Sequence, residues 1–276
     1  MRRSFFLGGL LAALAVFTVA TVSAQEGDAR VRVLHASPDA PAVDIYVDGG
    51  EAISNLAFGE ITDYVPLPAG DYQVEVFPAG AGGEGDPVIS AALTLDAGTD
   101  YTVAATGLLE NIEPLVLVDD NSPPAEGQAH VRFVHASPDA PAVDIAAAGV
   151  GVVISDVAFQ GSSDYLPLAA GSYDLEVLVS GTDTVALAVP GVAVEAGNVY
   201  TAFALGLAEG EPELFALLVL DASHVPDVPV VGSAGLVAEN TSGGSPVLLL
   251  AVVAGMLALM AAIAGTVAVK RGAVRS

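Results

Sequence analysis

The chain has 276 residues, enough for one or two domains, with 33 acidic and 8 basic side chains and a formal net charge of −25. Only three arginines lie within residues 25–245, which hold all 33 acids, so that part carries 3 − 33 = −30. Such a surface repels phosphate and argues against a nucleic-acid partner. The absence of cysteine excludes a disulfide framework, a thiolate metal site and a cysteine nucleophile.

Residues 1–24 are typical of a secretory signal peptide. Arg2 and Arg3 form a positive start, residues 5–22 are apolar, and small residues precede a cleavage point ahead of Gln25. The Arg-Arg-Ser-Phe-Phe start is also similar to a twin-arginine export signal, so both export routes stay open. Either route would carry the acidic part out of the cytoplasm.

One eleven-residue segment, His-Ala-Ser-Pro-Asp-Ala-Pro-Ala-Val-Asp-Ile, occurs at residues 35–45 and again at residues 135–145. Related blocks follow each copy at nearly the same spacing. A period near one hundred is too long for a solenoid, whose units have about 20–50 residues, so each repeat must hold its own core. We therefore predict two tandem domains, residues 29–119 and 129–221, joined by a linker over residues 120–128.

Within each repeat the apolar residues alternate with a period of two. Short segments rich in Val, Leu and Tyr are separated by Gly and Pro, and no strongly amphipathic helix is indicated. Seven or eight such segments in about 90 residues predict an all-β fold of two tandem β-sandwiches. The Ala-Gly-x-Tyr patterns that end at Tyr72 and Tyr173 predict a tyrosine-corner-like hydrogen bond. In the first repeat, strands are expected near residues 30–36, 42–47, 52–58, 61–67, 71–78, 87–95, 100–106 and 113–118.

The repeated segment joins the first two strands, and two interpretations of its polar residues stay open. In the structural interpretation, His35 caps the turn, Asp39 holds backbone amides, and Asp44 accepts from the turn or pairs with Arg32. In the functional interpretation, the same residues converge on a ligand or a cation. The candidate ligand-binding residues are then His35, Asp39 and Asp44, with His135, Asp139 and Asp144 in the second repeat.

A second candidate metal site lies where the two repeats meet. Asp119, Asp120 and Asn121 precede Pro123 and are similar to the calcium-binding linkers between cadherin domains. Carboxylate and amide oxygens suit Ca²⁺, although Ca²⁺ takes more oxygens than these three side chains provide. Ca²⁺ is the only cofactor that the sequence suggests.

After the second repeat, residues 222–245 are rich in Pro, Gly, Ser and Val and predict a stalk. Residues 246–269 carry no charge and as a helix would measure roughly 36 Å, enough to cross about 30 Å of hydrocarbon. The basic residues that follow place residues 270–276 in the cytoplasm. The expected product is a single-pass protein of the cell membrane with an extracellular ectodomain. A sortase signal is the alternative, but the chain has no Leu-Pro-x-Thr-Gly.

Three blocks together resemble the prokaryotic domain-of-unknown-function family 4397. They are Val-Arg-x-x-His-Ala-Ser-Pro-Asp-Ala-Pro-Ala-Val-Asp, then Tyr-x-Pro-Leu-x-Ala-Gly-x-Tyr, then Ala-Gly-x-x-Tyr-Thr, and both repeats carry them. The resemblance implies exported β-rich domains, often in tandem and on cell surfaces, with no catalytic residues to carry over. Tyr46 and Asp48 fit the family pattern, whereas residues 146–148 depart from it.

No catalytic constellation is evident in the chain. His-Glu-x-x-His, Gly-x-Ser-x-Gly and phosphate-loop motifs are absent, and only four histidines could serve as bases. We therefore expect a binding or adhesion module rather than an enzyme, with an extracellular glycan or protein as partner. A structural spacer of the cell envelope is the alternative, and a hydrolase with a paired-acid site is a third. With 6% aromatic residues and no Trp, a sugar-stacking platform is poorly supplied.

Overall fold

The computed structural model describes residues 27–224. The described residues belong to one compact unit. The expected signal peptide, membrane helix and cytoplasmic tail lie outside the described residues, as does the expected stalk beyond residue 224. Within residues 27–224, no helix has the length and hydropathy of a membrane span.

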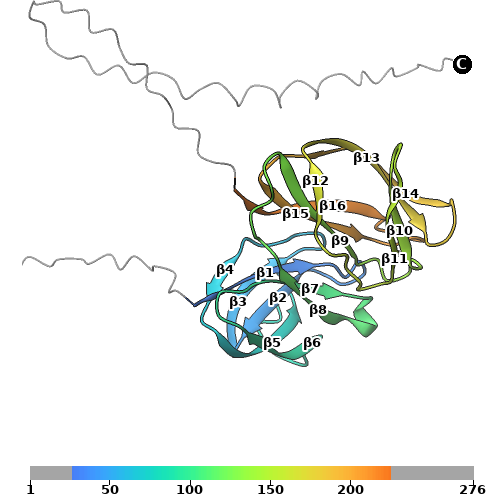
Figure 1. Cartoon of the computed structure of the whole chain (residues 1–276). Helices are drawn as coiled ribbons and strands as arrows, with labels where there is room; N and C mark the ends of the chain where they lie inside the picture. The colour runs from blue at the N-terminus through green and yellow to red at the C-terminus, as the bar shows by residue number, and fades with distance from the viewer. Residues whose placement is uncertain (1–26, 225–276) are drawn as a thin grey trace, which may run out of the picture. The chain divides into compact units, whose positions relative to one another are not determined.

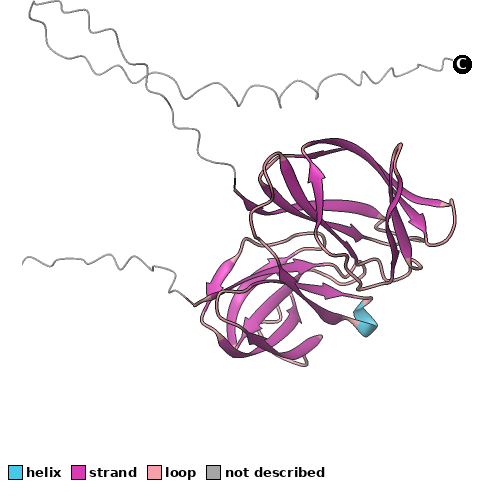
Figure 2. Ribbon diagram, in the orientation of Figure 1, coloured by secondary structure: helices cyan, strands magenta, loops and turns pink. Residues whose placement is uncertain are grey.

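The first domain is built from two four-stranded sheets (Figure 1, Figure 2). One sheet has the order β4-β1-β7-β8 and the other β3-β2-β5-β6. β1 pairs with β7 in parallel and the remaining neighbours are antiparallel. The elements are β1 (Ala29–His35), β2 (Val43–Val47), β3 (Gly50–Leu56), β4 (Val65–Leu67), β5 (Gly70–Pro78), β6 (Ile89–Leu95), β7 (Asp100–Thr106), a 3-10 turn (Leu109–Asn111) and β8 (Glu113–Asp119).

The second domain repeats this topology strand for strand. Its sheets have the orders β12-β9-β15-β16 and β11-β10-β13-β14, and β9 pairs with β15 in parallel. Two successive domains with the same strand order are what a duplicated unit should give. The strands are β9 (Gln128–His135), β10 (Val143–Ala147), β11 (Gly151–Val157), β12 (Leu166–Ala169), β13 (Gly171–Val179), β14 (Val185–Val194), β15 (Asn198–Leu205) and β16 (Phe215–Ser223).

Each domain buries apolar residues between its two sheets, as a β-sandwich does. In the first domain the cluster joins Val43, Ile45 and Val76 from one sheet to Ala105 of the other. In the second domain the equivalent cluster joins Val143, Ile145, Val157 and Val177 to Phe133 and Ala204. The prediction of an all-β fold with two tandem sandwich domains is therefore confirmed for the part of the chain that the structure describes.

The strand predicted over residues 61–67 is mostly wrong, because only β4 (Val65–Leu67) is a strand there. Ile61 makes an isolated bridge to Leu34, and Thr62 bonds the backbone of Val33 through its own backbone and its side chain. The segment before β4 therefore runs as a loop. The tyrosine-corner prediction is confirmed, since the Tyr72 and Tyr173 hydroxyls each donate to a carbonyl four residues upstream at 2.7 Å.

A third apolar cluster forms where the two domains meet. The sheets that contain β1 and β9 each contribute buried residues to it. The two domains therefore share a core in addition to their own. Its buried members are Leu34, Ala36, Ala104 and Leu117 from the first domain and Val134, Ala136, Phe203 and Leu205 from the second.

Candidate functional site

The repeated motif forms a turn that its own histidine closes. His35 is fully buried at the end of β1. Its Nε2 lies 2.9 Å from the carbonyl oxygen of Pro41, which can only accept, so Nε2 carries the proton and Nδ1 accepts from the Ser37 N–H at 3.3 Å. Burial lowers the pKa of His35 below its ordinary value despite the bond to Pro41. A neutral imidazole therefore ties the two ends of the turn together.

The carboxylates of the motif hold backbone amides of three separate segments. Asp39 Oδ1 accepts from the N–H of Leu109, in the connection between β7 and β8, at 2.7 Å. Asp44 accepts from the N–H of Asn55 on β3 at 2.7 Å and of Gly80 after β5 at 2.8 Å. Each carboxylate thus fixes the turn or β2 to a different neighbouring loop.

The second copy of the motif makes equivalent contacts, with one more backbone amide on its first aspartate. His135 Nε2 lies 3.0 Å from the Pro141 carbonyl, and burial lowers the pKa of His135. The backbone amides that bond Asp144 lower the pKa of its carboxyl. Asp139 accepts from Ala208 and Glu209, and Asp144 accepts from Asp156 and Gly181.

These contacts give a reason for the unchanged motif: its histidine and its two aspartates each hold a different piece of backbone. The three predicted ligand-binding residues of each repeat have protein partners, and those partners lie on different segments. Binding of a ligand by these residues stays a prediction.

The junction residues also have protein partners. Asp119 is buried, and its Oδ1 accepts from Arg132 Nη2 at 2.5 Å. Asp120 accepts from the Ser122 N–H, and Asn121 donates to Asp100 at 2.7 Å. Within residues 27–224, no group of three His, Asp or Glu side chains is arranged to hold a metal ion. Asp119, Asp120 and Asn121 line one polar pocket together with Asp100. The calcium prediction for these residues stays untested.

Arg32 does not pair with Asp44, so that alternative is wrong. Side chains alternate across a strand, and Arg32 points away from the face of β1 that carries Val33 and His35. Its Nη2 instead donates to Asp221 Oδ1 of the second domain at 2.6 Å. The arginine therefore belongs to the contact between the domains.

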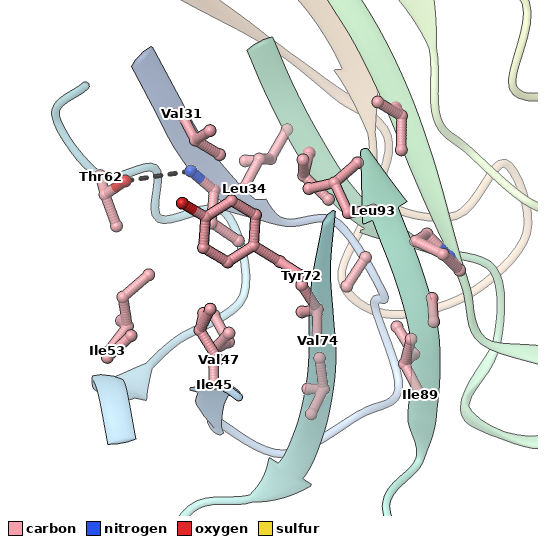
Figure 3. A pocket seen from close by; sticks show the side chains of 18 of the residues that line it. Val31, Leu34, Ile45, Val47, Ile53, Thr62, Tyr72, Val74, Ile89 and Leu93 are labelled. Carbon is pink, nitrogen blue, oxygen red and sulfur yellow. Dashed lines mark hydrogen bonds between the residues drawn. The ribbon is translucent and has the colours of Figure 1, made fainter. Parts of the chain in front are cut away.

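The first domain contains an apolar cavity of about 210 Å³ between its two sheets (Figure 3). Side chains from both sheets point toward it, including Val31 of β1, Ile45 of β2 and Val74 of β5. Val33 of β1 also lines it. Val65 of β4 and Val116 of β8 line it and are 50% and 43% exposed. The cavity therefore reaches solvent at the edge strands of one sheet.

Only three of the lining side chains, His35, Thr62 and Tyr72, are polar or carry a polar group. Each is engaged by the protein itself. Both His35 ring nitrogens are bonded, Thr62 Oγ1 accepts from Val33 N–H and donates to the Asp63 carbonyl, and the Tyr72 hydroxyl donates to the Pro68 carbonyl. The wall thus offers a ligand apolar contact and few free hydrogen-bonding groups.

The second domain has a larger side chain at the position of Val33. Residues 31–45 and 131–145 differ at only two places, where Val33 becomes Phe133 and Leu34 becomes Val134. Phe133 is 6% exposed and packs with Val143, Ile145 and Ala204 between the sheets. At the position where the first domain has Val33 beside the cavity, the second domain therefore has the Phe133 ring packed between its sheets.

Sequence reasoning missed this cavity. Its walls come from six or more strands, and no short motif records the volume that they enclose. One signal was present: the substitution of Val33 by Phe133 inside an otherwise matched block, at a position that faces the space between the sheets.

Comparison with known proteins gives a family but no activity. No curated protein matches the chain in sequence. Among solved structures, the Bacillus anthracis TIE protein is 12% identical with a TM-score of 0.22, and the match covers 66% of this chain and 34% of that one. This chain thus spans about a third of that protein's length.

The family 26 carbohydrate-binding module CBMbc of Eubacterium rectale Amy13K, solved with maltoheptaose, is 9% identical with a TM-score of 0.23. That match covers 71% of this chain and 98% of the module. Both TM-scores are too low to bear on fold or function. By contrast, one protein-family model matches the sequence over residues 29–146 and 147–231, which is most of the chain. The chain belongs to the family described as "Domain of unknown function (DUF4397)".

Proposed function

We propose that this chain is a non-enzymatic binding protein of the cell surface, and that its first domain takes an apolar ligand between its two sheets. The observation that carries the proposal is the apolar cavity of about 210 Å³ beside Val33. Ligand sites are typically concave, mostly apolar and largely preformed.

The energetics favour an occupant. At about 24 cal/mol per Å³, an apolar void of about 210 Å³ corresponds to roughly 5 kcal/mol of missing packing. That is a large share of the roughly 5–15 kcal/mol by which a domain is stable. A ligand that fills the space would restore part of those contacts, and each buried methylene would contribute about 0.8 kcal/mol.

The chemistry of the wall selects the class of ligand. A sugar ring would leave its hydroxyls without partners there, and an unpaired buried hydroxyl costs about 1–3 kcal/mol. A hydrocarbon chain makes no such demand and could keep a polar head at the exposed edge near Val65 or Val116. We infer that the ligand is an aliphatic chain, such as the acyl chain of a lipid. A glycan does not suit this cavity.

The sequence patterns at the two ends of the chain support display at the surface. The signal-peptide pattern of residues 1–24 and the uncharged residues 246–269 before a basic tail support an exported domain pair with one membrane anchor. The absence of catalytic motifs supports a binding role rather than an enzymatic one. A cavity for aliphatic chains would then lie close to a membrane.

The structural spacer is the second candidate, and the shared core between the domains favours it. Leu34, Val134 and Phe203 of that core are fully buried, so the domains are joined by more than a tether. A spacer needs this rigidity but has no use for an accessible cavity. Ligand binding therefore separates the two functions.

The test uses a fragment of residues 25–227, since residues 27–224 belong to one compact unit with its own apolar clusters. Neutral n-alcohols from hexanol to decanol are suitable probes, because charged fatty acids would be repelled by the acidic surface. Binding to the folded state must raise the unfolding midpoint. At about 0.8 kcal/mol per methylene, affinity should rise roughly fourfold for each added carbon until the cavity is full.

Two variants make the test specific. Val33→Phe places the ring of the second domain into the first and should lower decanol affinity at least tenfold. Leu205→Val alters the shared core from the second domain, does not touch the cavity lining and should leave affinity unchanged. The cavity is not a binding site if no alcohol gives a saturable rise of the unfolding midpoint, or if Val33→Phe binds decanol as well as the wild type. Either result would favour the structural spacer.

A further inference from the structure

The cavity of the first domain has a polar end, and it lies at the edge strand β4. Thr62 Oγ1 donates to the Asp63 carbonyl at 3.0 Å, and the Tyr72 hydroxyl donates to the Pro68 carbonyl at 2.7 Å. These two hydroxyls line the cavity and are bonded to the segment on either side of Val65. In Figure 3 the Tyr72 hydroxyl points to the side on which Thr62 lies. Because Val65 is 50% exposed, a polar head group at this end would keep its access to water.

The lining side chains at this end can accept hydrogen bonds but have none left to donate. A hydroxyl has a single proton, and Thr62 and Tyr72 each spend theirs on a backbone carbonyl. Each oxygen keeps at least one lone pair that can accept. His35, the third polar lining residue, has both ring nitrogens bonded. A head group that donates would therefore find acceptors here, whereas a carboxylate, which only accepts, would find no side-chain donor.

The charges beside the cavity also favour a cation. Asp63 is exposed and directly follows Thr62, whose hydroxyl its carbonyl holds. Glu51 of β3 is exposed as well and directly precedes Ala52, which lines the cavity. A positive head group at the edge of the cavity would therefore lie in an acidic environment.

An anionic head group would find no basic partner of the lysine or arginine type within residues 27–224. This part of the chain has no Lys and only three Arg. Each arginine pairs with a carboxylate of the protein: Arg30 with Asp100, Arg32 with Asp221 and Arg132 with Asp119. A carboxylate or phosphate head group would therefore meet the repulsion of the acidic surface without a free cation to offset it.

We infer that the aliphatic ligand of the first domain carries a protonated amine as its head group, which donates to the Thr62 and Tyr72 hydroxyls beside Asp63 while the chain fills the cavity. This inference rests on the proposed function, since it names the head group of the ligand that the cavity would hold. An ammonium group has three donors and no acceptor, which complements side chains that only accept. Its charge is attracted by acids within about 10 Å at 0.1 M salt.

The test compares ten-carbon probes on the fragment of residues 25–227, at about pH 7 and about 0.15 M NaCl. Decylamine is then protonated, decanoate is ionised and decanol is neutral. Affinities come from the rise of the unfolding midpoint with probe concentration. We expect decylamine to bind roughly fivefold more tightly than decanol, and decanoate roughly tenfold more weakly, as charge-assisted bonds to an acidic site predict. Butylamine has the same head group on a short chain and should give no saturable rise at the same concentrations.

Two matched variants separate the local carboxylate from the net charge of the protein. Asp63→Asn removes the acid at the polar end of the cavity. Asp164→Asn removes the equivalent acid of the second domain, whose carbonyl accepts from the Ser163 hydroxyl at 2.8 Å in the same way. Asp63→Asn should lower the preference for decylamine over decanol roughly threefold, the size expected for an exposed ion pair. Asp164→Asn changes the net charge equally and should leave that preference unchanged.

The outcomes distinguish the head group from the cavity itself. The inference is overturned if decanol binds and decylamine binds no more tightly, if butylamine binds as tightly as decylamine, or if both variants change the preference equally. Decanol binding would still support a cavity for an aliphatic chain in those cases. If decanol gives no saturable rise of the midpoint, the proposed function fails and the inference fails with it. The comparison of probes on the wild-type fragment decides the inference even if a variant does not fold.

Discussion

Exchanging the residues at positions 33 and 133 should move stability in opposite directions. Phe→Ala in a core costs about 3–5 kcal/mol, and Val keeps part of the side chain, so Phe133→Val should cost about 2–3 kcal/mol. Val33→Phe adds roughly four buried carbons, worth up to about 3 kcal/mol, against about 1–3 kcal/mol of strain where an aromatic ring must fit. Because the cavity of about 210 Å³ leaves room, we expect a net gain of about 1 kcal/mol.

Calorimetry of the fragment of residues 25–227 measures both changes. For a domain pair of this size, 1 kcal/mol shifts the midpoint by about 2–4 °C. Val33→Phe should therefore raise it by about 3 °C, and Phe133→Val should lower it by about 4–12 °C. Phe133→Val should also open a second site for decanol. The reasoning fails if Val33→Phe lowers the midpoint by several degrees while Phe133→Val leaves it unchanged. The first domain would then have no room beside Val33, and the second domain would not depend on the Phe133 ring for its packing.

Three further changes test the remaining contacts by thermal or denaturant unfolding. Asp221→Asn removes the nearer charge partner of buried Arg32 and leaves Asp119 at 4.0 Å, so it should cost about 3 kcal/mol, the low end for a broken buried pair. Breaking the more exposed Arg30 pair with Asp100→Asn should cost under about 1 kcal/mol. Burial lowers the pKa of His35 and His135, so as the pH falls the unfolded chain takes up protons before the folded chain does. The free energy of unfolding should therefore fall as the pH drops below about 6.5. A free energy of unfolding that is constant from pH 7 to pH 5 would contradict the assignment of neutral imidazoles. Since Asp119 already pairs with Arg132, Ca²⁺ should raise the midpoint no more than Na⁺ at equal ionic strength, and a saturable rise specific to Ca²⁺ would revive the metal site.

Much of the fold could be predicted because its signals are local. Alternation of apolar residues along segments such as residues 71–78 sets which side chains enter the sandwich, and Gly and Pro mark the turns. The duplicated motif gave the domain number directly. The strand before Val65 was misplaced because Thr62 satisfies the backbone of Val33 with its hydroxyl, a contact between residues that no pattern along the chain records.

The cavity and the contact between the domains were harder to predict, because the residues that form each of them are distant in sequence. Arg32 and Asp221 are 189 positions apart, and nothing in either neighbourhood identifies the partner. Yet only three arginines lie among the thirty-three acids of residues 25–245, and repeat alignment places Arg32 and Arg132 at equivalent positions. Two buried cations on matching strands of an acidic chain indicate a contact between the repeats, and this inference was open to sequence analysis.

The two substitutions inside the repeated block fall on two different surfaces of the first strand. Val33 and Phe133 face the space within each sandwich, while Leu34 and Val134 enter the core shared by the domains. All other residues from 31 to 45 are kept, including each one that holds a loop. A change in the turn would have loosened several loops at once. One side chain on each face of the first strand, at positions 33 and 34, could change without that cost. In one copy the Phe133 ring packs between the sheets, and in the other Val33 lines the cavity. This division of roles favours a binding domain held by a rigid partner over two equal spacers.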